Sequence, residues 1–476
     1  MLSPDTLDVI VNSSERNQRI GKASQNEASQ DESVSNRSRA LDQLFGLLEQ
    51  RSVGYCILHG HEKLPHLIDS DIDILVDRSI SHHQILNLLL ESERVFGFRV
   101  VRARGLYFVL AGKEKSGTPF FIELDFCHDV LVHHIKLLPG EAILGSRRRP
   151  ERYWAPSVEF EFASYAVRTI GKLELSPKRT AHLTTLYRQN PQKCREALFR
   201  AVSSDDCGVV CGAIETGNWN SVRGAIASIK QKMIVSAALR FPFSAVAGQW
   251  RSLLRALNRS ARREGLSVAV LGPDGAGKSS IIDAMRTGLA PVFPRTACWG
   301  FAPSLRRLLG KKPSSTATPH ALPPRSLAVS LVRVAYWSCY YALSQIVLIW
   351  QKMRGVLVMY DRHFVDILVD SRRYRYGGPI WLVELLSRCI RSPDLTLLLD
   401  APAEVLQRRK QEVPFEVTAQ QRQSYLRLIK TVENGMIIDC SRPLEQVSAN
   451  AIDIILGRLA DKVRERRSGR VLSPFI

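Results

Sequence analysis

Short, largely apolar runs recur along the second half of the chain, at residues 267–271, 357–360, 395–399 and 436–438. Each run has the length of a strand, and the segments between them carry apolar residues at helical spacing. Strands without polar alternation are typical of a parallel sheet that is buried on both faces. We therefore predict an α/β domain in which helices cover both faces of a parallel sheet.

A smaller pattern of alternating strands and amphipathic helices occupies the first part of the chain. The expected helices lie near 41–48 and 83–90, and the expected strands are 55–58, 72–76, 99–101, 107–111 and 120–126. This order predicts a small mixed α/β domain. From 157 to about 233 the apolar positions recur at helical spacing instead, which predicts a helical domain.

These patterns divide the chain into six segments. They are a disordered segment at 1–38, the mixed α/β domain at 39–150, the helical domain at 151–235, a basic helical linker at 236–265, the larger α/β domain at 266–460, and a basic tail at 461–476. The first segment has too few large apolar side chains to offset its ordering entropy. For the linker we favour a solvated connector, and peripheral contact with an anionic membrane stays open.

Composition adds a constraint on partners. The chain has 476 residues, and 66 Lys and Arg against 46 Asp and Glu give a net charge of +20. This surplus indicates an anionic partner, such as nucleotide phosphates, nucleic acid or an acidic membrane surface. Nine cysteines show no pairing pattern, and the amino terminus lacks the features of a signal peptide. We therefore expect a cytoplasmic protein with reduced thiols.

The stretch 327–350 is apolar and long enough to span a membrane. It lies between a glycine-rich loop and a strand that the larger domain requires, and a membrane span there would disrupt the sheet. We predict a buried helix packed on the sheet, with a membrane helix as the alternative.

The glycine-rich loop directly follows the first apolar run of the larger domain. Its sequence, Gly-Pro-Asp-Gly-Ala-Gly-Lys-Ser at 272–279, has the spacing of a phosphate-binding loop, and a helix is expected at 281–289. Glycines let the main chain wrap around phosphates, and the helix amino terminus adds its positive end. We expect Lys278 to reach the β and γ oxygens of ATP and Ser279 to bind Mg²⁺.

A second polar pair ends the run at 357–360. Asp361 follows this strand, in the position where P-loop folds place an acidic residue facing the metal. Arg362 is placed to neutralise charge on the transferring phosphoryl group. The alternative is a surface ion pair between the two.

Three motifs in this order resemble those of thymidylate kinases. They are Gly-Pro-Asp-Gly-Ala-Gly-Lys-Ser-Ser at 272–280, Asp-Arg-His at 361–363, and Pro-Asp-Leu-Thr-Leu-Leu-Leu-Asp-Ala-Pro at 393–402 with Glu-Val-Leu-Gln-Arg-Arg-Lys at 404–410. The resemblance covers 266–458. It implies an ATP- and Mg²⁺-dependent transfer of the γ-phosphoryl group to a nucleoside monophosphate or a related phosphorylated small molecule.

The resemblance also implies roles for single residues. Asp274 would face the sugar of the acceptor, and Arg362 would bridge the donor and acceptor phosphates. Arg408, Arg409 or Lys410 would close over ATP as a lid. The residues implied to bind ATP are Gly272, Asp274, Gly275, Gly277, Lys278, Ser279 and Ser280.

Two departures fall on the acceptor side. The Phe-x-Arg-Glu-Pro segment that holds the acceptor phosphate in thymidylate kinases is lacking at 298–308, and their Ser-x-Ala-Tyr-Gln segment is replaced at 366–378. The donor site is therefore kept and the acceptor site rebuilt. Asp370, Arg373 and Tyr374 are candidates for acceptor contacts, with a salt-bridged loop as the alternative.

Acidic residues cluster along two strands of the smaller domain. Asp71 and Asp73 share one face of the strand at 72–76, and Asp125 or Glu123 lies on a later strand. Grouped carboxylates repel one another unless a cation neutralises them, and Mg²⁺ prefers such oxygens. We expect Asp71, Asp73 and Asp125 to bind metal. The alternative is an acidic strand edge that discourages aggregation.

These carboxylates, after Leu-His-Gly at 58–60, resemble the nucleotidyltransferase fold, with the departure that His61 stands where serine is usual. This leaves two alternatives to the kinase: nucleotidyl transfer by the smaller domain, or a non-catalytic ATP-binding switch. We do not expect nucleic acid as a partner, and a homodimer stays open.

Overall fold

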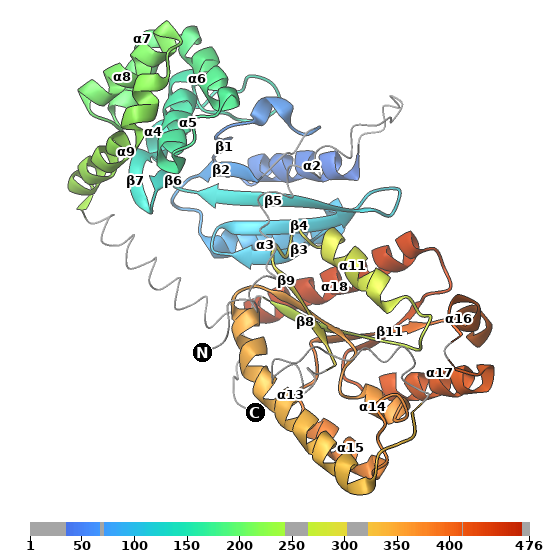
Figure 1. Ribbon diagram of the computed structural model, residues 1–476. Helices are drawn as coiled ribbons and strands as arrows, with labels where there is room; N and C mark the ends of the chain where they lie inside the picture. The colour runs from blue at the N-terminus through green and yellow to red at the C-terminus, as the bar shows by residue number, and fades with distance from the viewer. Residues whose placement is uncertain (1–34, 67–70, 243–264, 302–321, 412, 469–476) are drawn as a thin grey trace. The chain divides into compact units, whose positions relative to one another are not determined.

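The computed structural model describes residues 35–66, 71–242, 265–301, 322–411 and 413–468. The described residues form two compact units (Figure 1), one comprising 35–242 with 459–468 and the other 265–458. The expected disorder before residue 35, the basic linker at 243–264 and the tail beyond 468 lie outside the described residues.

The amino-terminal unit contains a five-stranded mixed sheet with the order β1-β2-β5-β4-β3. Its strands are β1 (Tyr55–Ile57), β2 (Ile72–Val76), β3 (Phe98–Arg104), β4 (Tyr107–Lys113) and β5 (Pro119–Cys127). β2 and β5 run parallel, whereas the other neighbours are antiparallel. A strand therefore lies at each of the five positions expected from the pattern.

Two helices with capped amino termini belong to the same unit. α2 (Asn36–Gln50) begins after Ser35, and α3 (His82–Phe96) begins with a capping box between Ser81 and Gln84. α2 starts inside the segment that the sequence predicts to be disordered. It is ordered there because its apolar face is buried in the core of the unit.

A hairpin and a group of helices complete this unit. The hairpin pairs β6 (Asp129–Val132) with β7 (Ile135–Pro139). The helices are α4 (Gly140–Gly145), α5 (Val158–Lys172), α6 (Pro177–Gln189), α7 (Pro191–Phe199), α8 (Ser204–Thr216) and α9 (Asn220–Arg240). The helices follow the predicted pattern, but the hairpin was not predicted, because strands this short give little periodic signal.

The second unit contains a five-stranded sheet with the order β12-β11-β8-β10-β9, in which all neighbours are parallel. Its strands are β8 (Leu266–Leu271), β9 (Thr296–Gly300), β10 (Leu357–Asp361), β11 (Leu395–Asp400) and β12 (Gly435–Asp439). β8 lies at the centre, and the strand order reverses there. Such a reversal leaves a crevice for ligands at the carboxyl ends of the strands.

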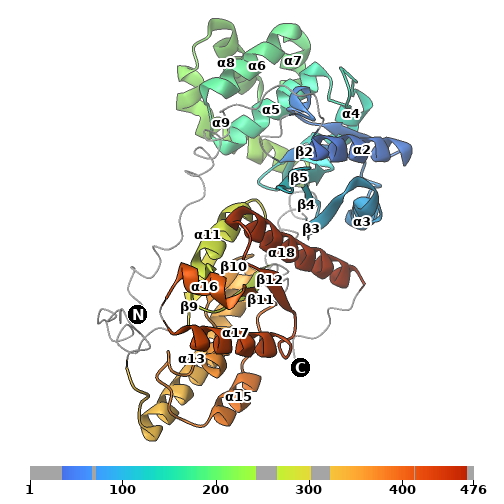
Figure 2. The same ribbon diagram turned by 90° about the vertical axis from the view of Figure 1, so that its right-hand side faces the viewer.

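Helices cover both faces of this parallel sheet, as the sequence predicts. They are α11 (Lys278–Gly288), α13 (Leu327–Met353), α14 (Asp366–Val369), α15 (Ile380–Cys389), α16 (Ala403–Arg409), α17 (Phe415–Ile429) and α18 (Leu444–Arg467). Figures 1 and 2 show α11 and α18 on one face of the sheet and α13 and α17 on the other.

α13 differs from the buried helix that the sequence predicts. Val334, Tyr341 and Leu348 are buried toward the core, but Val332 and Ile346 on the other side are 70% and 69% exposed. α13 therefore has apolar side chains on two faces, and the fold covers only one of them. Among the described residues, no helix is long and apolar enough to cross a membrane.

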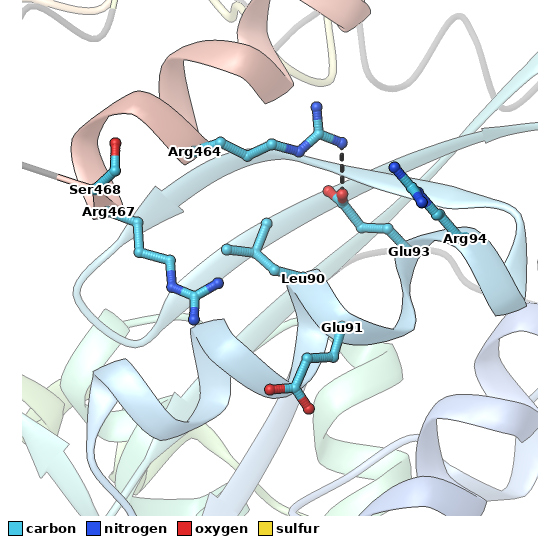
Figure 3. Close-up of a pocket in the computed structure, with 7 residues that line it drawn as sticks. All are labelled: Leu90, Glu91, Glu93, Arg94, Arg464, Arg467 and Ser468. Atoms are coloured by element: carbon cyan, nitrogen blue, oxygen red, sulfur yellow. Dashed lines mark hydrogen bonds and ion pairs between the residues drawn. The ribbon is translucent and has the colours of Figure 1, made fainter. Parts of the chain in front are cut away.

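The first residues of the segment predicted as a basic tail, 461–476, are helical. α18 continues to Arg467 because Val463 is buried in the core of the amino-terminal unit. The Arg464 Nη2 atom donates to Glu93 Oε2 at 2.6 Å, as Figure 3 shows, and Glu93 also accepts from the Val100 amide at 2.7 Å. The burial of Val463 and the ion pair of Arg464 with Glu93 thus hold the first residues of this segment.

Replacing Val463 with Asp should destabilise the amino-terminal unit by at least about 3 kcal/mol, since a carboxylate would be buried without a partner. Differential scanning calorimetry of the whole protein should show a lower melting temperature for that unit. The matched control is Asp461→Asn, at an exposed position two residues away. Equal melting of the two variants would contradict a structural role for this end of α18.

Candidate functional site

The loop at 272–279 leaves the carboxyl end of β8, the central strand. Gly272, Gly275 and Gly277 have φ of +148°, +86° and +80°, which favour glycine. A Cβ atom on Gly272 would lie 2.7 Å from the Leu399 carbonyl oxygen, and one on Gly275 would lie 2.6 Å from that of Leu406. The glycines are therefore required both by the backbone turn and by its close approach to the following elements.

α11 begins at the end of this loop. No side chain caps its first turn, so its amide groups have no partner of that kind and carry the positive end of the helix dipole. Ser279 and Ser280 lie in this turn with exposed side chains. The arrangement is that of an anion-binding helix terminus.

Lys278 is buried at the same place. Its ammonium donates to the carbonyl oxygens of Gly272 at 2.8 Å and Pro273 at 2.9 Å, so it lies across the loop. Burial lowers the pKa of Lys278 to about 8, and the nearby Arg362 adds to the effect. The side chain is thus a cation with few compensating charges, held where phosphates would bind.

One carboxylate offsets the cations around the loop. Asp274 accepts from Arg362 Nη2 at 3.2 Å through Oδ1 and from Arg373 Nη1 through Oδ2, and Lys278 lies 3.8 Å away. The sequence singled out all four residues, and the structure brings them together. These three cations outnumber Asp274 and the nearby buried carboxyl group of Asp366, so positive charge remains beside the loop and attracts anionic ligands.

Arg362 reaches this cluster through an uncommon backbone conformation, with φ +83°. The turn is held by Asp366, whose carboxylate accepts from the His363 amide at 2.6 Å and from the Tyr425 hydroxyl at 2.6 Å. The roles of Asp366 and Tyr425 as positioning residues were not predicted from the sequence. The spacing of three residues from His363 to Asp366 was the only local signal.

Asp361 ends β10 and is paired in register with Val270 of β8, two residues before the loop. Among the described residues, no hydrogen bond or ion pair to its carboxylate is found. Its oxygens and the exposed Ser279 hydroxyl are hard donors of the kind that Mg²⁺ prefers. The chemistry of these two residues suits a magnesium ion, and their role as its ligands stays a prediction.

The expected lid residues lie at the end of α16, next to the loop. A Cβ on Gly275 would be 3.4 Å from the Lys410 Cβ, so this segment borders the phosphate-binding turn. Arg408 and Arg409 are exposed, and Arg409 donates to the Cys440 carbonyl oxygen at 2.8 Å. Arg408 is consequently the better candidate for closing over a nucleotide.

The three residues predicted to contact the acceptor differ in the contacts they make. Arg373 reaches the charged cluster through an ion pair of its side chain, and the Tyr374 side chain interacts with Arg362 of the same cluster. Asp370 accepts from the Arg373 amide at 3.0 Å and from Gln421 Nε2 at 3.0 Å, so it positions the segment. Tyr374 is buried, and its ring centroid lies 4.3 Å from that of Phe301. The residues from 302 to 308 that depart from the acceptor motif lie outside the described residues.

A second cluster lies in the amino-terminal unit. Asp71, Asp73 and Asp125 each offer a carboxylate oxygen, and these oxygens lie within 4.8 Å of one another. Asp73 is directly opposite Asp125 on the parallel neighbour β5. Burial, with the charges of Asp73 and Asp71, raises the pKa of Asp125 to about 6. Glu123 instead accepts from the Tyr107 hydroxyl, so Asp125 is the third member.

One cation, Arg168, and one histidine, His59, contact this acidic cluster, and burial lowers the pKa of His59 to about 4, so its ring is neutral near neutral pH. Arg168 of α5 donates to Asp73, and His59 Nε2 lies 3.2 Å from the same carboxylate. No local pattern in the sequence points to Arg168, which is distant along the chain and lies on a helix of ordinary pattern. His61, where serine was expected, is buried with its Nδ1 atom 3.7 Å from Glu161, so it faces a different carboxylate.

Comparisons with known proteins bear on the second unit. No family model matches the chain. It is 27% identical over 220 residues to the thymidylate kinase of Oenococcus oeni, an alignment that covers 40% of this chain and 96% of the relative. It is 30% identical over 131 residues to the probable thymidylate kinase of Metallosphaera sedula, covering 25% of this chain and 64% of that relative. These relatives support a P-loop kinase-like region and give no support to the nucleotidyltransferase resemblance.

The lowered pKa of Lys278 predicts that ATP binding depends on pH. ATP affinity should fall as the pH rises above about 8, by up to about tenfold per unit, because the charged ammonium is the form that attracts phosphate. Calorimetric titrations across this range should show the decrease in the wild type, whereas Lys278→Met should bind weakly at every pH. An affinity that is unchanged on raising the pH would place the ammonium away from the phosphates.

Proposed function

We propose that the unit at 265–458 transfers the γ-phosphoryl group of ATP to a nucleoside monophosphate or a related phosphorylated small molecule, as an Mg²⁺-dependent enzyme. The observation that carries the proposal is the cluster at the phosphate-binding loop, where Lys278, Arg362 and Arg373 surround Asp274. The similarity to thymidylate kinases supports the same class of reaction.

In this reaction the bond between the γ-phosphorus and the β,γ-bridging oxygen breaks and ADP leaves. A new bond forms between the γ-phosphorus and an oxygen of the acceptor. The loop amides and the first turn of α11 bind the polyphosphate, and Lys278 contacts its β and γ oxygens. Arg362 stabilises charge on the transferring group. Ser279 and Asp361 would hold Mg²⁺, which supplies further neutralisation when bound. An anionic phosphate oxygen of the acceptor has no proton to lose, so the reaction needs no general base. This agrees with a site whose charged side chains are mainly cations.

The nature of the acceptor follows from the balance of charge. Arg362 and Lys278 suffice for the donor phosphates, and Arg373 is an additional cation beside the same crevice. Its backbone is fixed by Asp370 and Gln421, so the guanidinium is held on a positioned segment. Arg373 therefore supplies the anion-binding function of the missing Phe-x-Arg-Glu-Pro segment, and the acceptor carries a phosphate.

The test is a screen of nucleoside monophosphates and sugar phosphates with ATP and Mg²⁺, in which ADP formation and the phosphorylated product are both measured. At least one acceptor should raise ADP release far above the rate without acceptor, and Lys278→Ala should abolish the increase. ATP binding without transfer to any acceptor would contradict the kinase proposal and favour an ATP-dependent switch.

Arg373→Gln should raise the KM for the acceptor by about 10- to 100-fold, the loss expected for a charge-assisted hydrogen bond. The KM for ATP should change little. Steady-state kinetics with the best acceptor of the screen would measure both constants. The matched control is Arg372→Gln at the exposed neighbouring position. Equal effects of the two substitutions, or a loss confined to ATP binding, would contradict an acceptor role for Arg373.

The acidic cluster favours a second candidate function, metal-dependent nucleotidyl transfer by the amino-terminal unit. Asp71, Asp73 and Asp125 are hard oxygen donors at adjacent positions, which fits divalent cations. Arg168 lies where it could contact phosphate oxygens near such a metal. In this reaction an acceptor oxygen bonds to the α-phosphorus of a nucleoside triphosphate, and pyrophosphate leaves.

The substitution Asp125→Asn distinguishes a metal-binding site from an acidic surface that binds no metal. Without metal, it should raise the melting temperature of the amino-terminal unit by about 2–4 °C, because it removes one of three clustered charges. With Mn²⁺, the wild type should be stabilised and Asp125→Asn should not. Differential scanning calorimetry measures both effects, with Asp77→Asn, exposed just beyond β2, as the control. Equal responses of the wild type and Asp125→Asn to Mn²⁺ would exclude this metal site.

A further inference from the structure

α5 places a row of polar side chains beside the acidic cluster of the amino-terminal unit. Tyr165, Arg168 and Lys172 follow one another at spacings of three and four residues, so they lie on one face of this helix. These three side chains are half-buried or exposed, whereas Val167 and Ile170 on the opposite side of α5 are buried in the core. The polar face of α5 is thus the one that the core leaves open.

The first cation on this face is bound to the cluster. Arg168 Nη1 donates to Asp73 Oδ2, and the neutral His59 has its Nε2 atom 3.2 Å from the same oxygen. Among the described residues, no hydrogen bond or ion pair is found for the other oxygen, Asp73 Oδ1. Only 22% of the Arg168 side chain and 11% of the Asp73 side chain are exposed, so salt and water screen this ion pair little.

The second cation on this face is Lys172, one turn further along α5. Its charge acts on both Asp71 and His59, which places the ammonium near the cluster. The Lys172 side chain is exposed, and in the part of the chain that the structure describes no hydrogen bond or ion pair to it is found. α5 therefore presents to the carboxylates one cation that is bound to them and one that is not.

This arrangement sets the conditions under which a metal ion can bind. A divalent cation held by the three carboxylates would lie close to Arg168, because both would contact Asp73. Two cations that share one carboxylate repel each other, and burial keeps this repulsion strong. A metal ion alone should therefore bind less tightly than the three carboxylates would otherwise allow. A polyphosphate removes this penalty, because its oxygens can contact the metal ion and the cations of α5 together.

We propose that Arg168 and Lys172 make the acidic cluster selective for a metal–polyphosphate complex over the free metal ion. Arg168 is shared between Asp73 and one phosphate oxygen, and Lys172 binds a second phosphate oxygen. Both are positioning residues, and the ligand they select is the triphosphate group of a nucleoside triphosphate. This inference rests on the second candidate function, metal-dependent nucleotidyl transfer by the amino-terminal unit.

Calorimetric titrations of the full-length protein with Mn²⁺ alone, and with inorganic tripolyphosphate in the presence of Mn²⁺, test the selectivity. Every variant, including the parent, carries Lys278→Met, so that the phosphate-binding loop contributes little. Arg168→Gln should bind Mn²⁺ alone about tenfold more tightly than the parent, because the competing cation is removed. It should bind tripolyphosphate about 10- to 100-fold more weakly, because a charge-assisted hydrogen bond is lost. Lys172→Gln should weaken only the binding of tripolyphosphate.

Opposite changes in the two affinities distinguish this role from a purely structural one, because a folding defect would weaken both. The matched control is Arg188→Gln, which removes the same charge at an exposed position of α6 and should change neither affinity. Asp125→Asn should lose Mn²⁺ binding. If it instead binds Mn²⁺ like the parent, the second candidate function and this inference both fail. If Asp125→Asn loses the metal but the two affinities of Arg168→Gln change in the same direction or not at all, this inference alone is overturned.

Discussion

The phosphate-binding unit is organised around the Asp274 carboxylate and the three cations that share it. Lys278, Arg362 and Arg373 come from three separate segments, and without a common anion their charges would repel at this distance. The contact requires the tight turn that the loop glycines allow and the left-handed backbone of Arg362. One interaction thus links the loop after β8, the end of β10 and the segment after α14, and it leaves the positive charge that a phosphoryl-transfer site needs.

The amino-terminal unit has the opposite charge balance. Three carboxylates meet where the start of β2 lies beside the later part of β5. Burial and the charges of the other two carboxylates raise the pKa of Asp125, so it stays protonated to a higher pH than usual. Arg168 offsets part of this charge. One unit is thus suited to bind anions and the other to bind cations, and both kinds of site serve the chemistry of nucleotides.

Features encoded by neighbouring residues could be predicted from the sequence, and those made by distant contacts could not. The strand, glycine turn and helix around Lys278 are local, as is the alternation that places Asp71 beside Asp73. Arg168 pairs with Asp73 from 95 residues away, and Tyr425 reaches Asp366 from 59 residues away. The helical and strand repeats of the sequence do not reveal contacts between residues so far apart. α13 shows a further limit, since its apolar sequence does not reveal which of its faces the fold covers and which it leaves exposed.

The central claim is that main-chain amides around the loop, with Lys278, bind the polyphosphate of a nucleotide. Calorimetric titration with ATP, ADP and AMP in the presence of Mg²⁺ tests it most directly. We expect ATP and ADP to bind and AMP to bind at least about a hundredfold more weakly, because AMP lacks the β and γ oxygens that the loop and Lys278 contact. Equal binding of all three nucleotides, or no binding of ATP by the folded protein, would contradict the account.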